Sequence, residues 1–127
     1  MRARWYVLLI EPRAEYLSAH ELTRDGFQVF FPRIRVVNPR TGHEDAPLFP
    51  GYIFLRHEPD SGEWPSFRPV HRVVNWVKFG DDIPWISDED VAELREQLDA
   101  LNRGDGRSLN FRPGERVNVA SKSLEGL

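Results

Sequence analysis

The sequence predicts an α+β fold, in which helices pack on a mostly antiparallel sheet. Three short apolar segments of strand length, rich in aromatic residues, lie at residues 5–10, 27–31 and 73–79. Residues 13–24 favour a helix by composition, and a clear helical pattern follows Ser87. The resulting order of elements is strand, helix, two strands, short helix, strand and helix. This order is typical of an antiparallel sheet with helices packed on it.

The first strand and the first helix are separated by a proline. Residues 5–10 read as a buried strand, because they are apolar and end at Glu11-Pro12. Pro12 suits the first turn of a helix at residues 13–24, where its missing amide hydrogen is not needed. Residues 27–31 form the next strand, which we expect to end or bulge at Pro32.

A long hairpin is expected in the middle of the chain. Residues 33–37 alternate in polarity, and Asn-Pro-Arg-Thr-Gly at residues 38–42 is a strong turn signal. Residues 48–55 form the next strand, so we expect them to pair with residues 33–37. A loop at residues 58–63 and a short helix at residues 64–67 follow.

The clearest helix begins after Ser87, its expected N-cap. Asp90, three residues later, takes the place of the glutamate of a capping box. Apolar residues recur on one stripe at helical spacing, namely Val91, Leu94, Leu98 and Leu101. The acidic residues of the first turn suit the helix dipole.

The most informative segment is Pro-Leu-Phe-Pro-Gly-Tyr-Ile-Phe at residues 47–54. Pro50 turns the chain before the strand begins, and Gly51 lets another surface approach closely. The alternation of a strand then places Tyr52 and Phe54 on the same face. These aromatic side chains either fill the core or form a surface that another protein binds.

The composition excludes several classes of function. A net charge of −3 argues against a general nucleic-acid-binding protein, and residues 87–105 hold seven acids against two bases. The absence of cysteine excludes disulfides, thiolate chemistry and cysteine zinc sites. No apolar run approaches the ~18 residues of a membrane span. The run at residues 5–10 is too short for a secretory signal, so we expect a cytoplasmic protein.

Catalytic chemistry has little support in the sequence. The histidines are scattered, and no glycine-rich nucleotide loop is present, so we expect neither an enzyme nor a cofactor. His43, Glu44 and Asp45 have the composition of a metal site, but they lie at the expected hairpin tip. A solvated turn is the simpler interpretation there. A small hydrolase using these residues is kept as an alternative.

Several motifs follow one another in a specific order. They are Trp-Tyr-Val at 5–7, Leu-Phe-Pro-Gly-Tyr-Ile-Phe at 48–54, Arg-Val-Val-Asn-Trp-Val at 72–77, Pro-Trp-Ile-Ser-Asp-Glu-Asp-Val at 84–91 and Pro-Gly-Glu-Arg-Val-Asn-Val at 113–119. In this order they resemble the N-terminal (NGN) domain of the NusG family of transcription elongation factors. The last motif resembles the start of the small β-barrel KOW domain. The resemblance covers essentially the whole chain.

The resemblance implies a fold and a function. It implies a four-stranded, mainly antiparallel sheet flanked by helices at residues 1–102, a linker at 103–110 and a truncated KOW start at 111–127. It also implies a protein that binds bacterial RNA polymerase, suppresses pausing and is not an enzyme. The implied partners are the clamp helices of the β′ subunit and the β subunit. Through the KOW domain, a ribosomal protein or termination factor is implied as well. We expect a monomer.

In this family an apolar depression receives the clamp helices. The residues that could supply this surface are Tyr6, Leu9, Phe49, Tyr52, Phe54, Trp76 and Phe79. By position in the motif, Leu9, Phe49, Tyr52 and Phe54 match it best. Glu63 and Trp64 occupy the place where the family reaches the β subunit. Rigid aromatic side chains bind proteins at a low cost in entropy, and the Tyr52 hydroxyl favours exposure. The alternative is that most of these side chains fill the core.

Specialised members of the family also touch the non-template DNA strand. The matching positions are Arg13, His20, Arg24, His71 and Arg72. The same segment carries acids, namely Glu11, Glu15, Glu21 and Asp25, so a solvated helix face is the alternative. Leu48 before Phe49 and the short hairpin tip favour an RfaH-type antiterminator, although Trp64 and residues 84–91 also fit the general factor. A stand-alone RNA- or ribosome-binding module is the main alternative function.

Overall fold

The computed structural model describes residues 3–40 and 42–103 of the chain. Its elements are β1 (Arg4–Ile10), α1 (Glu15–Arg24), β2 (Val29–Phe30), β3 (Arg33–Asn38), β4 (Gly42–Pro47), β5 (Tyr52–His57), the 3₁₀ turn η1 (Pro69–His71), β6 (Val73–Trp76), β7 (Trp85–Ile86) and α2 (Asp88–Asn102). The expected KOW start at residues 111–127 lies outside the described residues, and so does the expected linker beyond Arg103.

Strand β1 is the centre of the main sheet. The sheet has the order β2-β5-β1-β6, and the short strand β7 also pairs with β1. All of these pairings are antiparallel, and Leu8 of β1 lies opposite both Ile53 of β5 and Trp76 of β6. The expected antiparallel α+β fold is therefore confirmed, with β7 as a fifth strand beside the four that were expected.

The two faces of the sheet are covered by different helices. On one face, Trp5 and Phe54 pack against the apolar stripe of α2, whose Val91, Leu94 and Leu98 are buried. On the other face, the buried residues that pack with α1 are Leu8, Ile10, Leu22, Ile53 and Leu55. Both faces are apolar because successive side chains of β1 and β5 point to opposite sides.

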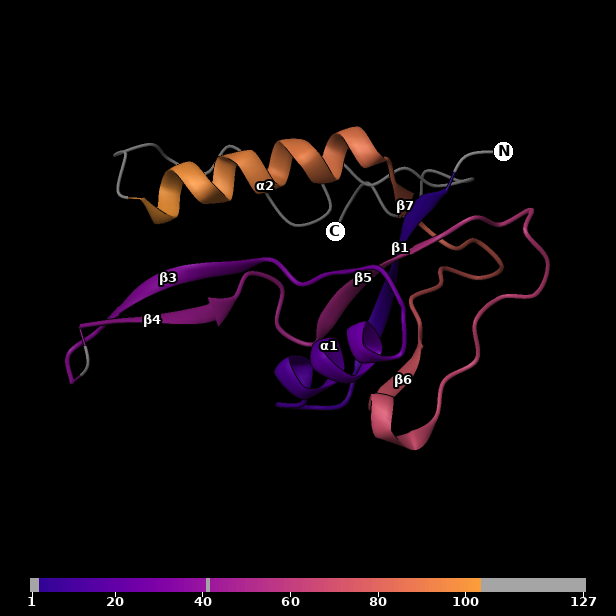
Figure 1. The fold of residues 1–127 in the computed structure, drawn as a ribbon, viewed down its shortest axis with the longest axis horizontal. Helices are drawn as coiled ribbons and strands as arrows, with labels where there is room; N and C mark the ends of the chain where they lie inside the picture. Colours follow the sequence, from indigo (N-terminus) through magenta and orange to yellow (C-terminus); the bar gives the residue numbers. More distant parts are fainter. Residues whose placement is uncertain (1–2, 41, 104–127) are drawn as a thin grey trace.

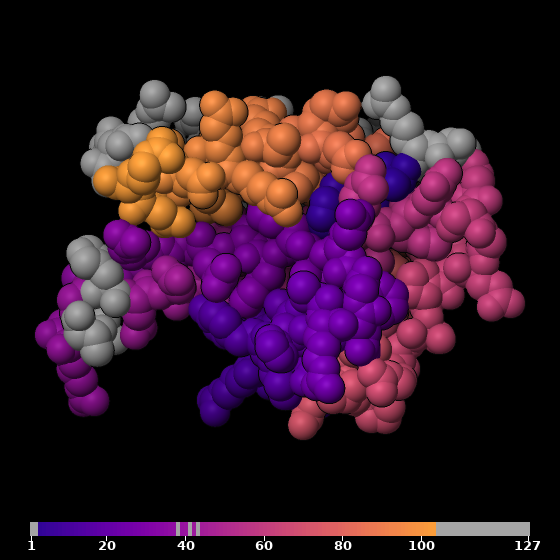
Figure 2. All heavy atoms as spheres, viewed as in Figure 1, coloured from indigo at the N-terminus to yellow at the C-terminus, as the bar shows by residue number. Residues whose placement is uncertain are grey.

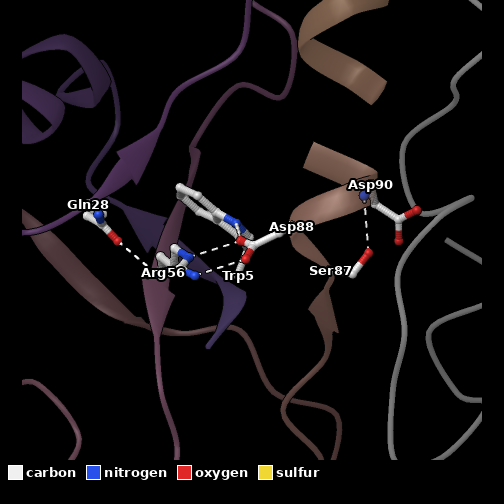
Figure 3. Close-up of polar contacts among 6 residues, drawn as sticks. All are labelled: Trp5, Gln28, Arg56, Ser87, Asp88 and Asp90. Atoms are coloured by element: carbon white, nitrogen blue, oxygen red, sulfur yellow. Dashed lines mark hydrogen bonds and ion pairs between the residues drawn. The ribbon is translucent and has the colours of Figure 1, made fainter. Parts of the chain in front are cut away.

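Helix α2 is fixed to the sheet at its first residue. Ser87 is the N-cap, and its Oγ accepts a hydrogen bond from the Asp90 amide at 3.1 Å, as expected. The Asp88 carboxylate accepts hydrogen bonds from Trp5 Nε1 at 2.7 Å and from Arg56 Nε and Nη2 at 2.9 Å (Figure 3). Because Trp5 and Arg56 lie opposite each other on β1 and β5, one carboxylate joins α2 to both central strands. These bonds to Asp88 also raise the pKa of Arg56.

The other end of α2 lies on the β3–β4 hairpin, which projects from the body of the molecule (Figures 1 and 2). Asn102 holds this end. Its Oδ1 accepts a hydrogen bond from the Arg35 amide at 2.8 Å, and its Nδ2 donates to the Arg33 carbonyl at 3.2 Å. The helix therefore runs from its attachment to β1 and β5 at Asp88 to its attachment to β3 at Asn102.

The expected hairpin between residues 33–37 and 48–55 is wrong. β3 pairs with β4 in a separate two-stranded sheet, whereas β5 pairs with β1 and β2. The chain turns at residues 48–51, where Pro50 has no amide hydrogen for a ladder and Gly51 has a φ of 89°. After this turn the chain leaves the hairpin and continues as β5 in the main sheet.

Several boundaries differ from those expected. The strands predicted at 27–31 and 73–79 contract to Val29–Phe30 and Val73–Trp76. The helix predicted at 13–24 begins at Glu15, because Arg13 has a φ of 62°, outside the helical region.

An aromatic cluster covers part of the sheet face opposite α2. It consists of Tyr6, His57, Trp64 and Trp76, and the Trp64 ring lies 4.8 Å from Tyr6, 4.4 Å from His57 and 5.2 Å from Trp76. The short helix expected at residues 64–67 is absent, and Trp64 packs on the sheet from an irregular segment. His57 Nε2 is buried without a hydrogen-bond partner, and burial lowers the pKa of His57.

Removing the Asp88 carboxylate tests how α2 is fixed. We expect Asp88→Ala to lower the free energy of unfolding by about 1–2 kcal/mol, because Trp5 Nε1 loses its partner and a partly exposed ion pair is lost. The measurement is urea unfolding. Glu96→Ala, on an exposed position of the same helix, is the control and should stay within about 0.5 kcal/mol of wild type. Equal effects of the two substitutions would contradict this role for Asp88.

The pKa of His57 predicts a pH dependence. Since the folded pKa lies below the unfolded value of about 6.5, the unfolded chain binds the proton more readily. The contribution of neutral His57 to stability is complete above that value and is lost as the pH falls below it. We expect His57→Phe to lose less thermal stability than wild type between about pH 7.5 and 5.5. If both proteins lose the same, His57 does not titrate as the structure implies.

Candidate functional site

Part of the sheet face beneath α2 is left uncovered. Three cross-strand pairs of β1 and β5 share this face, namely Trp5–Arg56, Val7–Phe54 and Leu9–Tyr52. The side chains of the first two pairs lie against α2 or bond to it, and Phe54 is only 5% exposed. The third pair lies beyond the helix, so Leu9 is 37% exposed and Tyr52 is 39% exposed.

We call Leu9, Phe49 and Tyr52 the apolar patch. Phe49 is half-buried, and its ring lies 5.9 Å from that of Phe54, which supports it from below. On the edge strand β6, the exposed Asn75 lies directly opposite Leu9. Val74, the residue before Asn75, is 55% exposed and lies at the bulge where the pairing shifts between Leu9 and Ile10.

The turn before Tyr52 is held firmly. Gly51 donates its amide hydrogen to Glu15 Oε2 at 3.0 Å, and its carbonyl accepts from the Ile10 amide at 2.8 Å. The Tyr52 amide donates to the Phe49 carbonyl at 3.1 Å. Glu15 is 8% exposed, so α1 contributes a buried carboxylate to the shape of this turn. Such a support fixes the patch before any partner arrives.

The residues predicted to face the polymerase fall into separate groups. Leu9, Phe49 and Tyr52 come together in the apolar patch. Tyr6 and Phe54 are core residues, 3% and 5% exposed, and support the sheet rather than offer a surface. The remaining two predicted residues lie elsewhere: Trp76 belongs to the aromatic cluster on the opposite face, and Phe79 is half-buried in the connection from β6 to β7.

Sequence reasoning did not single out Val74. A signal was present, because two consecutive valines in a half-buried strand cannot both face the core. Val73 packs in the core below α1, and Val74 is the exposed one.

Glu63 and Trp64, the residues predicted to contact the β subunit, lie away from the patch. Trp64 packs in the aromatic cluster on the opposite face of the sheet and still keeps 36% of its surface exposed. Glu63 beside it is exposed.

The backbones of two arginines of the predicted DNA-contacting set lie close to that of Glu11. Arg13 and Arg72 both have left-handed backbones, with φ of 62° and 58°. The Arg72 carbonyl accepts from the Glu11 amide at 2.9 Å, and Arg13 follows Glu11 by two residues. A left-handed conformation costs a residue with a Cβ about 1–2 kcal/mol. We call these two residues the arginine pair. Glu11 follows the end of β1, the strand that carries Leu9, so the backbone of the pair adjoins this end of the strand.

The other predicted DNA contacts do not join this pair. His71 is 2% exposed and bonded to Asp25, so its ring is not available to a ligand. Arg24 pairs with Glu21 at 3.5 Å. His20 lines a groove of about 580 Å³ where α1, β2 and α2 meet, together with Arg33 and Arg95.

The residues of the alternative metal site lie in strand β4, not at the hairpin tip as expected. Over the described ranges, no group of three histidine, aspartate or glutamate side chains is arranged to hold a metal ion. In the same part of the chain, no helix has the length and apolar character needed to cross a membrane.

Comparison with known proteins identifies the family of this chain. Residues 3–95 match the model of the family described as transcription termination factor NusG. The chain is also 26% identical, over 133 aligned positions, to a transcription termination/antitermination protein NusG of Pseudomonas aeruginosa. That alignment covers 94% of this chain and 75% of the relative. The chain belongs to the NusG family, and this membership indicates a transcription elongation or antitermination factor with an NGN domain.

Proposed function

We propose that this domain binds bacterial RNA polymerase through the apolar patch, with the clamp helices of the β′ subunit as its partner, and so promotes processive transcription. The observation that carries the proposal is the exposed Leu9–Tyr52 pair on a sheet face that α2 otherwise covers. Membership of the NusG family of transcription factors supports RNA polymerase as the partner.

The patch has the chemistry of a protein-binding surface. Phe49 and Tyr52 are aromatic and lose little side-chain entropy on binding, and Leu9 adds aliphatic area between the two central strands. An exposed apolar patch on a rigid support favours a helical partner with an apolar face. The Tyr52 hydroxyl provides one polar group that fixes orientation.

A second contact of the same complex involves Glu63 and Trp64. Trp64 packs on the face of the sheet opposite the apolar patch. A domain with protein-binding residues on two faces is suited to bridge two subunits, and we assign Trp64 to the β subunit. In the proposed complex, β′ and β therefore bind opposite sides of the sheet.

The arginine pair is assigned to the phosphates of the non-template strand. Arg13 forms no ion pair with a carboxylate in the described part of the chain, and Arg72 has only an exposed contact to Glu11 at 3.6 Å. Such an exposed pair is weak and exchanges readily for a phosphate. Two arginines suit a backbone contact rather than sequence reading.

A stand-alone RNA-binding module needs a basic stripe beside exposed aromatic residues. The arginine pair supplies two cations, and the neighbouring α1 carries acids, so we favour the polymerase complex. The choice of an RfaH-type paralogue and the partners of the KOW domain remain predictions from the sequence.

The apolar patch is tested by truncating its side chains. We expect Leu9→Ala and Tyr52→Ala each to weaken binding to a β′ clamp-helix fragment about tenfold or more, because each removes apolar contact from the centre of the interface. The measurement is titration calorimetry with the purified fragment.

Leu17→Ala is the matched control. Leu17 is 44% exposed, close to the 37% of Leu9, but lies on α1 away from the patch. It should leave the affinity unchanged. Equal losses for Leu9→Ala and Leu17→Ala would show that the patch has no special role, and wild-type protein that fails to bind the fragment would overturn the proposed partner.

A further inference from the structure

The backbone of Arg72 is held in an unfavourable conformation from both sides. Its φ of 58° and ψ of 26° are left-handed, a region where glycine fits and a residue with a Cβ is strained. Its amide donates to the Pro69 carbonyl at 3.1 Å, and its carbonyl accepts from the Glu11 amide at 2.9 Å. Residues in such a region persist only where the surroundings determine them, and they cluster at functional sites.

The residue before it, His71, is fixed by three contacts. Its amide donates to the Arg68 carbonyl at 2.9 Å, and its Nδ1 lies 3.0 Å from the Arg68 amide. Its Nε2 lies 2.6 Å from Asp25 Oδ2. The ring is 2% exposed and is enclosed edge-on by Phe27 and Phe67.

These contacts define the tautomer of His71. A backbone amide can only donate, so Nδ1 accepts from Arg68 and the ring proton lies on Nε2. Nε2–H therefore donates to Asp25, whose second partner on the same oxygen is the Arg68 guanidinium. Both bonds hold the pKa of Asp25 below its ordinary value.

Asp25 connects two distant parts of the chain. It directly follows α1, and its own amide closes the helix by donating to the Glu21 carbonyl at 3.1 Å. Arg13 lies just before the start of the same helix. The Asp25–His71 bond therefore fixes η1 to α1, and with it the position of Arg72 relative to Arg13.

We infer that Asp25 and His71 are positioning residues that hold the arginine pair ready for the phosphates of a single nucleic-acid strand. The inference rests on the proposed assignment of Arg13 and Arg72 to nucleic acid and adds the device that orients them. His71, one of the predicted DNA contacts, acts through Arg72 rather than by touching the ligand.

The direction in which one substitution changes DNA affinity distinguishes a positioning role from simple electrostatics. Removing an acid from a protein that binds a polyanion normally strengthens binding, because repulsion falls. If Asp25 positions Arg72, Asp25→Ala weakens binding despite losing a negative charge. Asp25→Asn keeps an oxygen that accepts from His71 Nε2–H, so binding at or above the wild-type level is expected.

The experiment is titration of the full chain with a labelled single-stranded DNA of mixed sequence at low salt. We expect Arg72→Ala to weaken binding by roughly three- to tenfold. The slope of log affinity against log salt concentration should fall by about one, the effect of one lost phosphate contact. Asp25→Ala is expected to weaken binding to a similar extent. In the Arg72→Ala background, Asp25→Ala should have no further weakening effect, because both act through one contact.

The outcomes separate the two ideas. If Arg72→Ala leaves DNA binding unchanged, or the wild-type chain does not bind, the assignment to nucleic acid fails and the inference fails with it. If Arg72→Ala weakens binding but Asp25→Ala does not, or the two losses add in the double variant, the positioning role alone is overturned. Polymerase binding, measured with the clamp-helix fragment, is a separate readout that Arg72→Ala should leave unchanged.

The strain at Arg72 gives an independent test. Arg72→Gly removes the side chain and suits the left-handed backbone, whereas Arg72→Ala removes the side chain and keeps the strain. We expect Arg72→Gly to unfold at a temperature roughly 4–8 °C above Arg72→Ala, with equally weak DNA binding in both. Equal melting temperatures would show that the backbone is not strained at Arg72. That result would contradict the claim that the surrounding contacts hold Arg72 in an unfavourable conformation.

Discussion

The placement of helix α2 determines which part of the sheet a partner can reach. Asp88 fixes the first turn to Trp5 and Arg56, and Asn102 fixes the last residue to the β3 strand. Between these points the helix covers the Trp5–Arg56 and Val7–Phe54 pairs of β1 and β5. It leaves the Leu9–Tyr52 pair exposed. The exposed patch is thus a consequence of where the helix is attached, and the core residues beneath α2 make it rigid.

The same end of the sheet collects the other functional features. The Gly51 turn is closed by Ile10 and by the buried carboxylate of Glu15, and the Glu11 amide binds the carbonyl of Arg72. Apolar patch and arginine pair therefore share one set of backbone contacts at the end of β1. If the domain functions as proposed, a polymerase bound at the patch would place nucleic acid close to the arginines.

Local rules predicted much of this fold. The apolar run at residues 5–10 predicted a strand, and capping chemistry predicted the N-cap at Ser87. The hydroxyl group of Tyr52 predicted that its side chain is exposed. The pairing of β5 could not be predicted, because a turn signal fixes where a strand begins but not which strand it joins. Burial of Tyr6 and Phe54 also depends on which helix covers which face, which is a property of tertiary packing.

The central claim is that the uncovered end of the sheet is the docking site. Its most direct test is a map of amide chemical-shift changes as a β′ clamp-helix fragment is added to the isotopically labelled chain. The predicted changes are at Leu9, at residues 49–52 and at Val74, with little change along α2. Changes confined to α2 or to the segment around Trp64, with Leu9 and Tyr52 unaffected, would contradict the claim.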